Sequence, residues 1–432
     1  MVVFLLVLVV VLALLGGVHW YVWRRLVRDV TAPGGLPRRL GTAAVVVLPL
    51  LSVAALVSAR AGVPFRLQQV IAWPGQMWLA VLLYLVLALV VGEAVRPLLR
   101  ARLAHREPAA AVPEPQPVPV PAAETAPDPA PAATGPAAPT DPAEPGTPAG
   151  PATDPTDPSR RLFVSRVVGG TAAAVALGTV GYGTYGVLRG PRVKRVTVPL
   201  AKIPRAAHGY RIAVVSDIHL GPILGRAHTQ RIVDTINSTQ PDLIAVVGDL
   251  VDGTVENLGP AAEPLARLRA RHGSFFVTGN HEYFSGADAW VDHVRELGLR
   301  PLRNERLEIA AGFDLAGVDD VAGESEGRGP DFVRALGDRD RARAAVLLAH
   351  QPIVVHDAVR HGVDLQLSGH THGGQLWPGN LLADLANPTV AGLERYGDTQ
   401  LYVSRGAGAW GPPVRVGAPS DITVVELASK QA

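Results

Sequence analysis

The stretch Arg-Ile-Ala-Val-Val-Ser-Asp-Ile-His, from Arg211 to His219, decides the fold of the C-terminal half of this chain. It opens with a short apolar run, 211–216, which has the length and composition of a buried β-strand. It ends in a carboxylate and an imidazole, Asp217 and His219, which are both metal-binding groups. An Asp-x-His triplet occurs by chance in many chains, so its meaning depends on the rest of the sequence.

The same pattern of an apolar run with a polar ending recurs four times toward the C-terminus. Helical stretches such as 229–237 and 288–297 lie between several runs, and this alternation predicts a layered α/β domain over 195–432. The carboxyl ends of such strands are expected at one edge of a sheet, where open α/β folds bind ligands. The four further runs are 243–247 followed by Gly248-Asp249-Leu250-Val251-Asp252, 275–278 followed by Gly279-Asn280-His281-Glu282, 346–349 followed by His350, and 363–367 followed by Gly369-His370-Thr371-His372-Gly373.

The polar endings supply oxygen and nitrogen donors of the kind that Mn, Fe and Zn accept. A pair of divalent ions needs one bridging carboxylate, and such a pair can activate a water molecule and hold a phosphoryl group in line. The chain contains no cysteine, which excludes disulfides, thiolate metal sites and cysteine nucleophiles. The sequence therefore predicts a site for two divalent metal ions.

These motifs, in this order, resemble those of the calcineurin-like metallophosphoesterase superfamily over about 205–427. The resemblance implies a layered β-sandwich-type domain with flanking helices. It also implies that a hydroxide bridging two metal ions hydrolyses a phosphate ester. Asp249 would bridge the ions. The other implied ligands are Asp217, His219 and His372 for the first ion and Asn280, His350 and His370 for the second.

The resemblance further implies two residues that act without binding metal. His281 would stabilise the phosphoryl oxygens or protonate the leaving oxygen, and Asp252 would orient His281. Glu282 stands where many members of the superfamily have Asp, at a position that is not a metal ligand. The segments Gly-His-Thr-His-Gly-Gly-Gln-Leu-Trp at 369–377 and Val-Ser-Arg-Gly at 403–406 resemble the bacterial membrane-associated or twin-arginine-exported branch.

The N-terminal region, 1–106, predicts an all-α transmembrane region with three helices. The apolar run that begins at 2–18 is long enough to cross the hydrocarbon core of a bilayer. No basic segment precedes this run, which favours an uncleaved span over a signal peptide. The second and third candidate spans are 40–59 and 73–95, and the only charge expected inside them is the unpaired Glu93, near an end.

The arginines around these spans predict how the chain crosses the membrane. Five arginines lie between the first two spans and four follow the third, whereas the loop between the second and third spans has two. Because positive residues accumulate on the cytoplasmic side, the loop 24–39 and the segment after 96 are expected in the cytoplasm. The N-terminus is then expected outside.

The segment between the two halves of the chain has two predicted parts. Residues 107–158 are rich in Pro and Ala, which predicts a disordered linker. The segment 159–190 begins with Ser-Arg-Arg-Leu-Phe before the weakly hydrophobic run 167–188, and it resembles a twin-arginine export signal. The alternative is a fourth ordinary span with a basic flank. Both interpretations place the domain 195–432 outside the cytoplasm.

The expected protein is thus a multi-pass cell-membrane enzyme with an extracytoplasmic catalytic domain. Its net charge of +2 gives no signal for nucleic-acid binding, and nothing indicates a protein partner. One alternative is a hydrolase of a membrane phospholipid or a lipid-linked pyrophosphate, because the spans confine the site near the bilayer. Another is a non-catalytic metal-binding sensor, but a sensor is expected to lose a ligand or His281, and all are present. Trp377, Trp410 and Arg405 are candidate substrate contacts.

Overall fold

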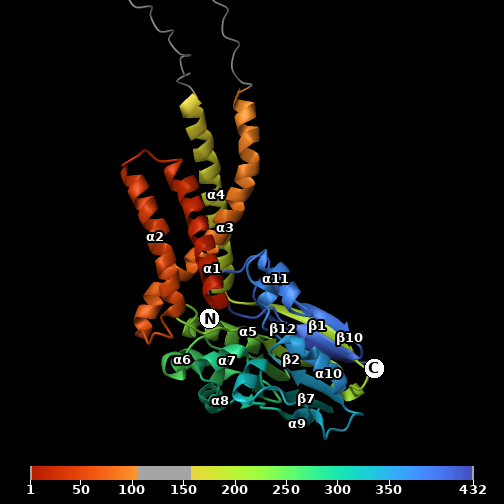
Figure 1. Ribbon diagram of the computed structural model, residues 1–432. Helices are drawn as coiled ribbons and strands as arrows, with labels where there is room; N and C mark the ends of the chain where they lie inside the picture. The colour runs from red at the N-terminus through yellow and green to blue at the C-terminus, as the bar shows by residue number, and fades with distance from the viewer. Residues whose placement is uncertain (1, 105–156, 431–432) are drawn as a thin grey trace, which may run out of the picture.

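The computed structural model describes residues 2–104 and 157–430. It has two parts: a bundle of four long helices, and an α/β part that packs against one end of the bundle (Figure 1). The predicted linker, 107–158, lies outside the described residues apart from its last two positions. The bundle helices are α1 (Val2–Trp23), α2 (Leu36–Val57), α3 (Phe65–Ala104) and α4 (Asp157–Leu188).

Each bundle helix covers most or all of one of the apolar runs that the sequence singled out: α2 begins before its run, 40–59, and ends two residues before that run does, and α3 and α4 extend beyond theirs. A short π-helix, Arg24–Arg28, continues α1. Most apolar side chains of α1 and α2 are exposed in the isolated chain, as expected of helices that lipid surrounds. Four helices of the described chain are long and apolar enough to cross a membrane, at Leu5–Arg28, Leu36–Val57, Phe65–Arg102 and Leu162–Leu188.

The bundle contains a set of paired charges that the sequence did not predict. Glu93 Oε1 in α3 lies 2.8 Å from Arg25 Nε, and the Tyr21 hydroxyl donates to the same oxygen at 3.2 Å. Arg25 also pairs with Asp29 at 3.2 Å. The expectation that Glu93 is unpaired is therefore wrong. The π-helix Arg24–Arg28 and α3 are far apart in sequence but meet in space. The Glu93 carboxylate is therefore balanced by the positive charge of Arg25.

The first sheet follows the bundle almost directly. Only residues 189–191 separate α4 from β1, so no long linker intervenes between bundle and sheet. β2, β3 and β4 are parallel neighbours, and β12 runs antiparallel to β2. In spatial order the strands are β1 (Arg192–Leu200), β12 (Asp421–Ser429), β2 (Tyr210–Val215), β3 (Leu243–Val247), β4 (Ser274–Val277) and β5 (Arg300–Pro301).

The second sheet also has six strands. β7, β8, β9 and β11 are parallel to one another, with an antiparallel strand at each edge. In spatial order they are β10 (Gly392–Tyr396), β11 (Thr399–Val403), β9 (Leu365–Ser368), β8 (Ala344–Leu348), β7 (Phe313–Gly317) and β6 (Glu305–Ile309).

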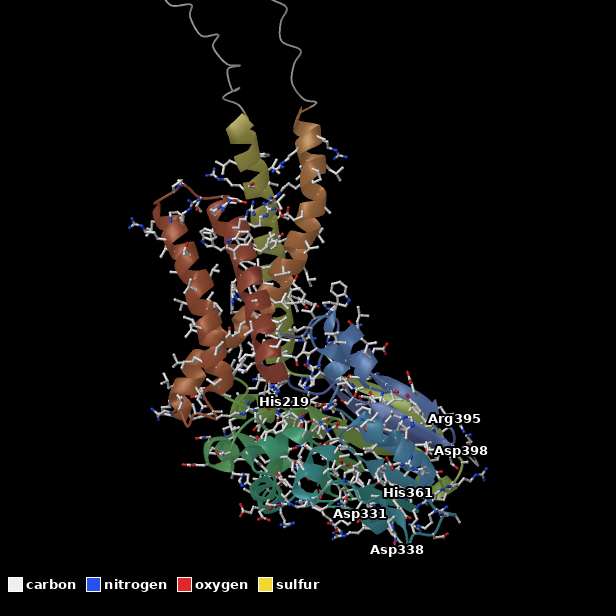
Figure 2. The ribbon with its side chains drawn as sticks, viewed as in Figure 1. His219, Asp331, Asp338, His361, Arg395 and Asp398 are labelled. Carbon is white, nitrogen blue, oxygen red and sulfur yellow. The ribbon has the colours of Figure 1, made fainter. Side chains whose placement is uncertain are left out.

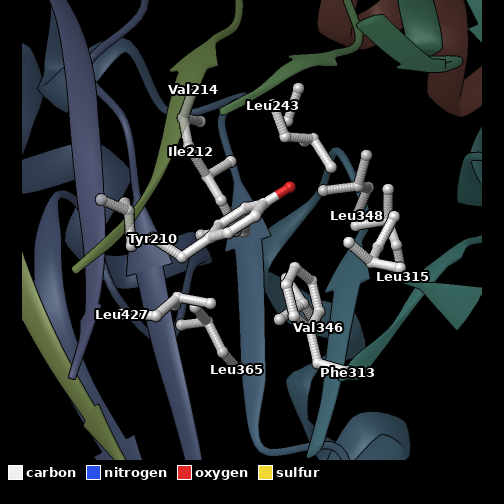
Figure 3. Close-up of a cluster of buried hydrophobic side chains, with 14 of the residues drawn as sticks. Tyr210, Ile212, Val214, Leu243, Phe313, Leu315, Val346, Leu348, Leu365 and Leu427 are labelled. Atoms are coloured by element: carbon white, nitrogen blue, oxygen red, sulfur yellow. The ribbon is translucent and has the colours of Figure 1, made fainter. Parts of the chain in front are cut away.

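The two sheets share one hydrophobic core. Tyr210 and Val214 of β2 belong to the same buried cluster as Phe313 of β7, Leu348 of β8 and Leu365 of β9 (Figure 3). Every second residue of these strands points into this cluster, which is the alternation expected of strands packed on one face. The shared core therefore fixes the position of one sheet relative to the other.

The five strands that the sequence predicted are present, with ends shifted by at most two residues, but they do not lie in one sheet. β2, β3 and β4 belong to the first sheet, and β8 and β9 belong to the second. The expectation of a single sheet edge is therefore wrong. The carboxyl ends of the strands still meet, because the two sheets pack on the same core.

Helices cover the outer face of the first sheet and connect the strands. Ile232 of α5, Leu258 of α6 and Trp290 of α8 are buried in a second cluster against this sheet. The helices of the α/β part are α5 (Arg226–Ser238), α6 (Val255–Ala262), α7 (Asn280–Ser285), α8 (Ala287–Glu296), α9 (Phe332–Leu336), α10 (Val355–Arg360) and α11 (Gly379–Ala386), with 3-10 turns at Arg205–Ala207, Glu263–Arg267, Val321–Glu326, Pro352–Val354 and His372–Gly374.

Candidate metal centre

Histidine and aspartate side chains from both sheets converge at the end of the α/β part that faces the helix bundle. Figure 2 places His219 at this boundary. Within each of three groups, the atoms able to bind a metal ion lie within 4.8 Å of one another. The groups are Asp217, His219 and His372; Asp249, His350 and His370; and His219, Asp252 and His281. All the residues that the sequence predicted for the site except Asn280 belong to these groups.

The first group lies where the loop after β2 meets the loop after β9. His219 Nε2 and His372 Nε2 are 3.0 Å apart, and His372 Nε2 is 3.4 Å from Asp217 Oδ1. The backbone N–H of His370 donates to Asp217 Oδ1 at 3.0 Å, which ties the two loops together. The buried Arg415, which the sequence did not single out, donates to the His372 carbonyl at 3.0 Å. Two imidazole nitrogens and a carboxylate that face one buried point suit one metal ion.

The second group lies between β3 and β8. His350 Nε2 is 3.2 Å from Asp249 Oδ2, and His350 Nδ1 donates to the Val247 carbonyl at 2.9 Å. His370 Nδ1 lies 3.0 Å from Asn280 Oδ1, so the predicted ligand Asn280 joins this group. Asp249 Oδ2 is also 3.7 Å from His219 Nε2. The carboxylate of Asp249 therefore lies between the two groups, where a bridging ligand is required.

Asp252 contacts two histidines rather than the one that was expected. Its Oδ1 accepts from His219 Nδ1 at 2.9 Å and from His281 Nδ1 at 2.7 Å. These two N–H groups hold the pKa of Asp252 below its usual value, although burial opposes this. Because the ionised carboxylate can only accept, both rings donate through Nδ1 and turn Nε2 toward the centre of the site.

The backbone around the site adopts an unusual conformation. Among the described residues, eight residues other than glycine have a positive φ. Five of them are predicted ligands. A positive φ is uncommon outside glycine and persists only where the surroundings enforce it, and such residues concentrate at functional sites. The five are Asp217 at 53°, His219 at 48°, Asp249 at 51°, His370 at 73° and His372 at 53°.

Two glycines provide room for these ligands. A Cβ atom at Gly369 would overlap Ser216 Oγ and the Asp217 carboxylate, and one at Gly279 would overlap the Asp249 carboxylate. Glycine is thus required here for close approach, and any larger residue would displace a ligand.

Glu282 fastens the loops that carry Asp249 and Asn280. Its buried carboxylate accepts from the backbone N–H groups of Gly279 at 2.6 Å, Leu250 at 2.8 Å and Asp249 at 3.0 Å. Burial, and next the charge of Asp249, raise the pKa of Glu282 to about 7. The sequence showed only that this position differs from many relatives. Its bracing role depends on three backbone groups that sequence alone cannot place together.

Glu282→Ala is expected to destabilise the α/β part by about 3 kcal/mol or more, because each buried N–H left unpaired costs about 1–3 kcal/mol. The measurement is the thermal unfolding midpoint of the full chain in detergent. The control is Glu296→Ala, since the Glu296 side chain is 76% exposed, and a shift within about 0.5 kcal/mol is expected there. Equal midpoints for both variants would show that Glu282 does not brace these loops.

In each group the surroundings raise the pKa of one histidine, His219 or His350, and lower the pKa of the other, His372 or His370. Burial opposes the charged form of His219, but Asp252, Asp249 and Asp217 outweigh it and raise the pKa of His219 to about 9. Burial, and next the neighbouring His350, lower the pKa of His370 to about 4. Neutral imidazole is the form that binds a metal ion, so an ion must displace a proton from His219 but finds His370 already neutral. The donors present therefore fit divalent metal ions.

His281 lies at the more exposed edge of the site, here called its entrance, between two exposed aromatic side chains: its own side chain is 15% exposed, and those of His219 and His350 are fully buried. Its ring centroid lies 5.5 Å from that of Phe284 and 5.7 Å from that of Trp410, and both pairs meet edge to face. Phe284 and Trp410 are 68% and 57% exposed. The candidate substrate contact Trp410 therefore lies beside His281, and Phe284 is a second neighbour that the sequence did not indicate.

Comparison with known proteins identifies a family that matches the part of the chain in which these motifs lie. A sequence profile of the family described as calcineurin-like phosphoesterase matches residues 210–374, a range that contains every predicted metal ligand as well as His281 and Asp252. Among solved structures, the chain is similar to a dimetal phosphatase from Danio rerio at 11% identity and a TM-score of 0.34, over 51% of this chain and 93% of that one.

Curated relatives extend the similarity beyond that range. A transmembrane protein with metallophosphoesterase domain from Danio rerio is 39% identical over 264 residues, 58% of this chain and 60% of the relative. An uncharacterized metallophosphoesterase from Helicobacter pylori strain J99 is 37% identical, over 59% of this chain and 69% of the relative. The uncharacterized metallophosphoesterase YkuE from Bacillus subtilis is 30% identical, over 63% of this chain and 98% of the relative. The chain thus spans less than two thirds of the Danio rerio relative.

Proposed function

Because this chain belongs to the calcineurin-like phosphoesterase family, we propose that it hydrolyses a phosphate ester in a site that holds two divalent metal ions. The observation that carries this proposal is the position of Asp249 between two groups of oxygen and nitrogen donors. Asp217, His219 and His372 would hold one ion. Asn280, His350 and His370 would hold the other, with Asp249 shared. Mn, Fe and Zn all suit these donors.

Two ions bound there would supply Lewis-acid stabilisation of the phosphoryl oxygens and a nucleophile at neutral pH. The chain itself supplies His281. Since His281 Nδ1 donates to Asp252 at 2.7 Å, its Nε2 is directed to the site, 4.0 Å from Asp249 Oδ2. From there His281 would protonate the leaving oxygen or stabilise a phosphoryl oxygen. Asp252 would position both His281 and His219.

Asp252→Asn is expected to reduce turnover by about 10–100-fold, a smaller loss than removal of His281, because the amide oxygen can still accept from both rings. Metal content per protein and turnover should be measured on the same samples. Metal retained with moderately lower turnover is the expected result. A loss as large as that of His281→Ala, with both ions retained, would instead show that Asp252 takes part directly in the reaction.

The direct test of the proposed activity is a panel of phosphate monoesters, diesters and pyrophosphates, assayed on the full chain in detergent after metals are removed and added back. The full chain is preferable to the isolated α/β part, because Leu376, Val414 and Val416 pack on bundle residues. Hydrolysis that depends on added metal supports the proposal. A protein that binds both ions and hydrolyses nothing in the panel would favour the sensor alternative.

We further propose that the two sheets form a face-to-face sandwich, which the core they share supports. The bundle supports a topology with the α/β part outside the cytoplasm. The N-terminus lies at the bundle end that carries the α/β part (Figure 1). The opposite end of the bundle carries the arginine-rich π-helix Arg24–Arg28, the C-terminal end of α3 and the N-terminal end of α4. In this arrangement 1–106 holds three spans, 107–158 is a cytoplasmic linker, 159–190 crosses outward and 195–432 is the catalytic domain.

Reporter fusions after residues 130 and 200 are expected to give a cytoplasmic and an external signal, respectively. A cytoplasmic signal at 200 would overturn the topology. The twin-arginine route, which would export a folded and metal-loaded domain, is tested by replacing Arg160 and Arg161 with lysine. Blocked export is expected. Normal export of the double variant would leave the topology standing and remove the twin-arginine mechanism.

A further inference from the structure

Helix α11 carries apolar side chains that nothing in the described chain covers. Leu381, Leu382 and Leu385 are 60%, 71% and 85% exposed, and the helix has no buried residue. Trp377, just before the helix, is 53% exposed and extends this surface. Single exposed leucines are ordinary, but four large apolar side chains within nine consecutive positions, 377–385, form a patch of the kind that marks a binding surface.

The patch is continuous with the helix bundle. The Tyr84 hydroxyl of α3 donates to the Trp377 carbonyl at 3.0 Å, and Leu376 packs on the bundle cluster that contains Trp78 and Leu89. Tyr84 lies inside the candidate span Phe65–Arg102. α11 lies beside the bundle in Figure 1. When the bundle crosses a bilayer, α11 is therefore held at the level of lipid.

The opposite side of the α/β part has a different character. Asp338 and Asp398 lie on the side away from the bundle (Figure 2), and their side chains are fully or almost fully exposed. Charges face water there, whereas α11 faces the region that the bundle occupies. The α/β part therefore has one side with charged residues exposed to solvent and another side suited to contact with a membrane surface.

The patch is also fastened to the entrance of the metal centre. Gln375, three residues after His372, donates through Nε2 to the Trp410 carbonyl at 2.8 Å and accepts from the Trp410 N–H at 2.9 Å. Trp410 in turn contacts His281. α11 begins four residues after Gln375, and Gly374 has no room for a Cβ beside the Asn380 backbone. The helix thus cannot move far without moving the site entrance.

We propose that α11 and Trp377 are embedded in the lipid leaflet beside the bundle, and that the phosphate ester hydrolysed at the metal centre is carried by a lipid of that leaflet. The phosphate would reach His281, while the hydrocarbon chains remain among lipid near Trp410 and α11. The substrate class rests on the proposed function, whereas the lipid contact of α11 does not. A second copy of this chain is the competing occupant of the patch.

The lipid contact is tested by spin labels, which the absence of native cysteine makes straightforward. Leu382→Cys is labelled in the full chain in phosphatidylcholine nanodiscs. The control is Val333→Cys on α9, because Val333 is 72% exposed and Leu382 is 71% exposed. The label at 382 is expected to be accessible to oxygen but protected from a water-soluble nickel reagent, and the label at 333 the reverse. Equal accessibility, or dipolar broadening from a second copy at 382, would overturn the lipid contact.

The substrate class is tested with Leu382→Asp. Its hydrolysis of phosphatidic acid or phosphatidylglycerol in nanodiscs is expected to fall about tenfold or more, while its hydrolysis of p-nitrophenyl phosphate and bis(p-nitrophenyl) phosphate stays unchanged. The soluble esters also report that the variant folds. Equal effects on both kinds of ester, or no lipid hydrolysis by the unaltered chain that cleaves the soluble esters, would overturn the inference. Failure of the unaltered chain on every ester would instead overturn the proposed function.

Discussion

Asp249→Ala is expected to release both metal ions and to abolish turnover. Its Oδ2 lies 3.2 Å from His350 Nε2 and 3.7 Å from His219 Nε2, so it is the carboxylate that contacts both groups. Without it, the second group has no carboxylate and the first keeps only Asp217, so both lose negative charge that favours a divalent ion, and the shared ligand is gone. The measurement is metal content per protein by elemental analysis, on protein purified without chelators.

The control for this variant is Asp314→Ala. Asp314 is equally buried and accepts from Arg343 Nε at 2.9 Å, outside the metal centre. This control is expected to lose stability and keep both ions, which separates loss of a ligand from general damage to the fold. Retention of one ion by Asp249→Ala would show that Asp249 serves only one of the two positions, and the two-metal assignment with a shared carboxylate would then be wrong.

Several elements of this fold could be predicted because their signals are local. β3 was predicted at its observed bounds, since a run of five apolar residues, 243–247, leaves little ambiguity. β1, by contrast, was not predicted, because it lies at a sheet edge, has three basic residues among its first four and buries only Val198 and Leu200. The distribution of strands over two sheets could not be predicted either. Which strands pair depends on long-range contacts such as that of β12 with β2, and nothing in the local sequence of either strand identifies its partner.

The candidate site shows the same division between local and long-range information. The ligand types and their places at strand ends follow from short motifs, and the structure brings all of them together. The double role of Asp252 could not be predicted, because His219 and His281 approach it from different loops. The contact between Tyr84 and Trp377 also joins two parts of the chain that the sequence presents as separate regions. Its consequence, a candidate metal centre held against the helix bundle, appears only in the folded chain.

The proposed role of His281 makes its removal a sharp test. His281→Ala is expected to keep both ions, since no predicted ligand depends on its ring, and to lose about 10²–10⁴-fold in turnover, the usual contribution of a general acid or base. Metal content and turnover are measured together. Phe284→Ala is the control, because Phe284 lies 5.5 Å from His281 at the same entrance and has no acid–base group. A collapse of metal content together with activity would identify His281 as a ligand instead.

The leaving group decides between the two proposed actions of His281. If Nε2 protonates the leaving oxygen, the loss should be large for an alkyl phosphate and much smaller for p-nitrophenyl phosphate, because p-nitrophenolate leaves without a proton. If His281 instead stabilises a phosphoryl oxygen, both esters should lose turnover by a similar factor. We expect the first result, because His281 Nδ1 donates to Asp252 at 2.7 Å, which directs Nε2 to the position where a leaving oxygen would lie. Equal losses for the two esters would assign His281 to the phosphoryl oxygens.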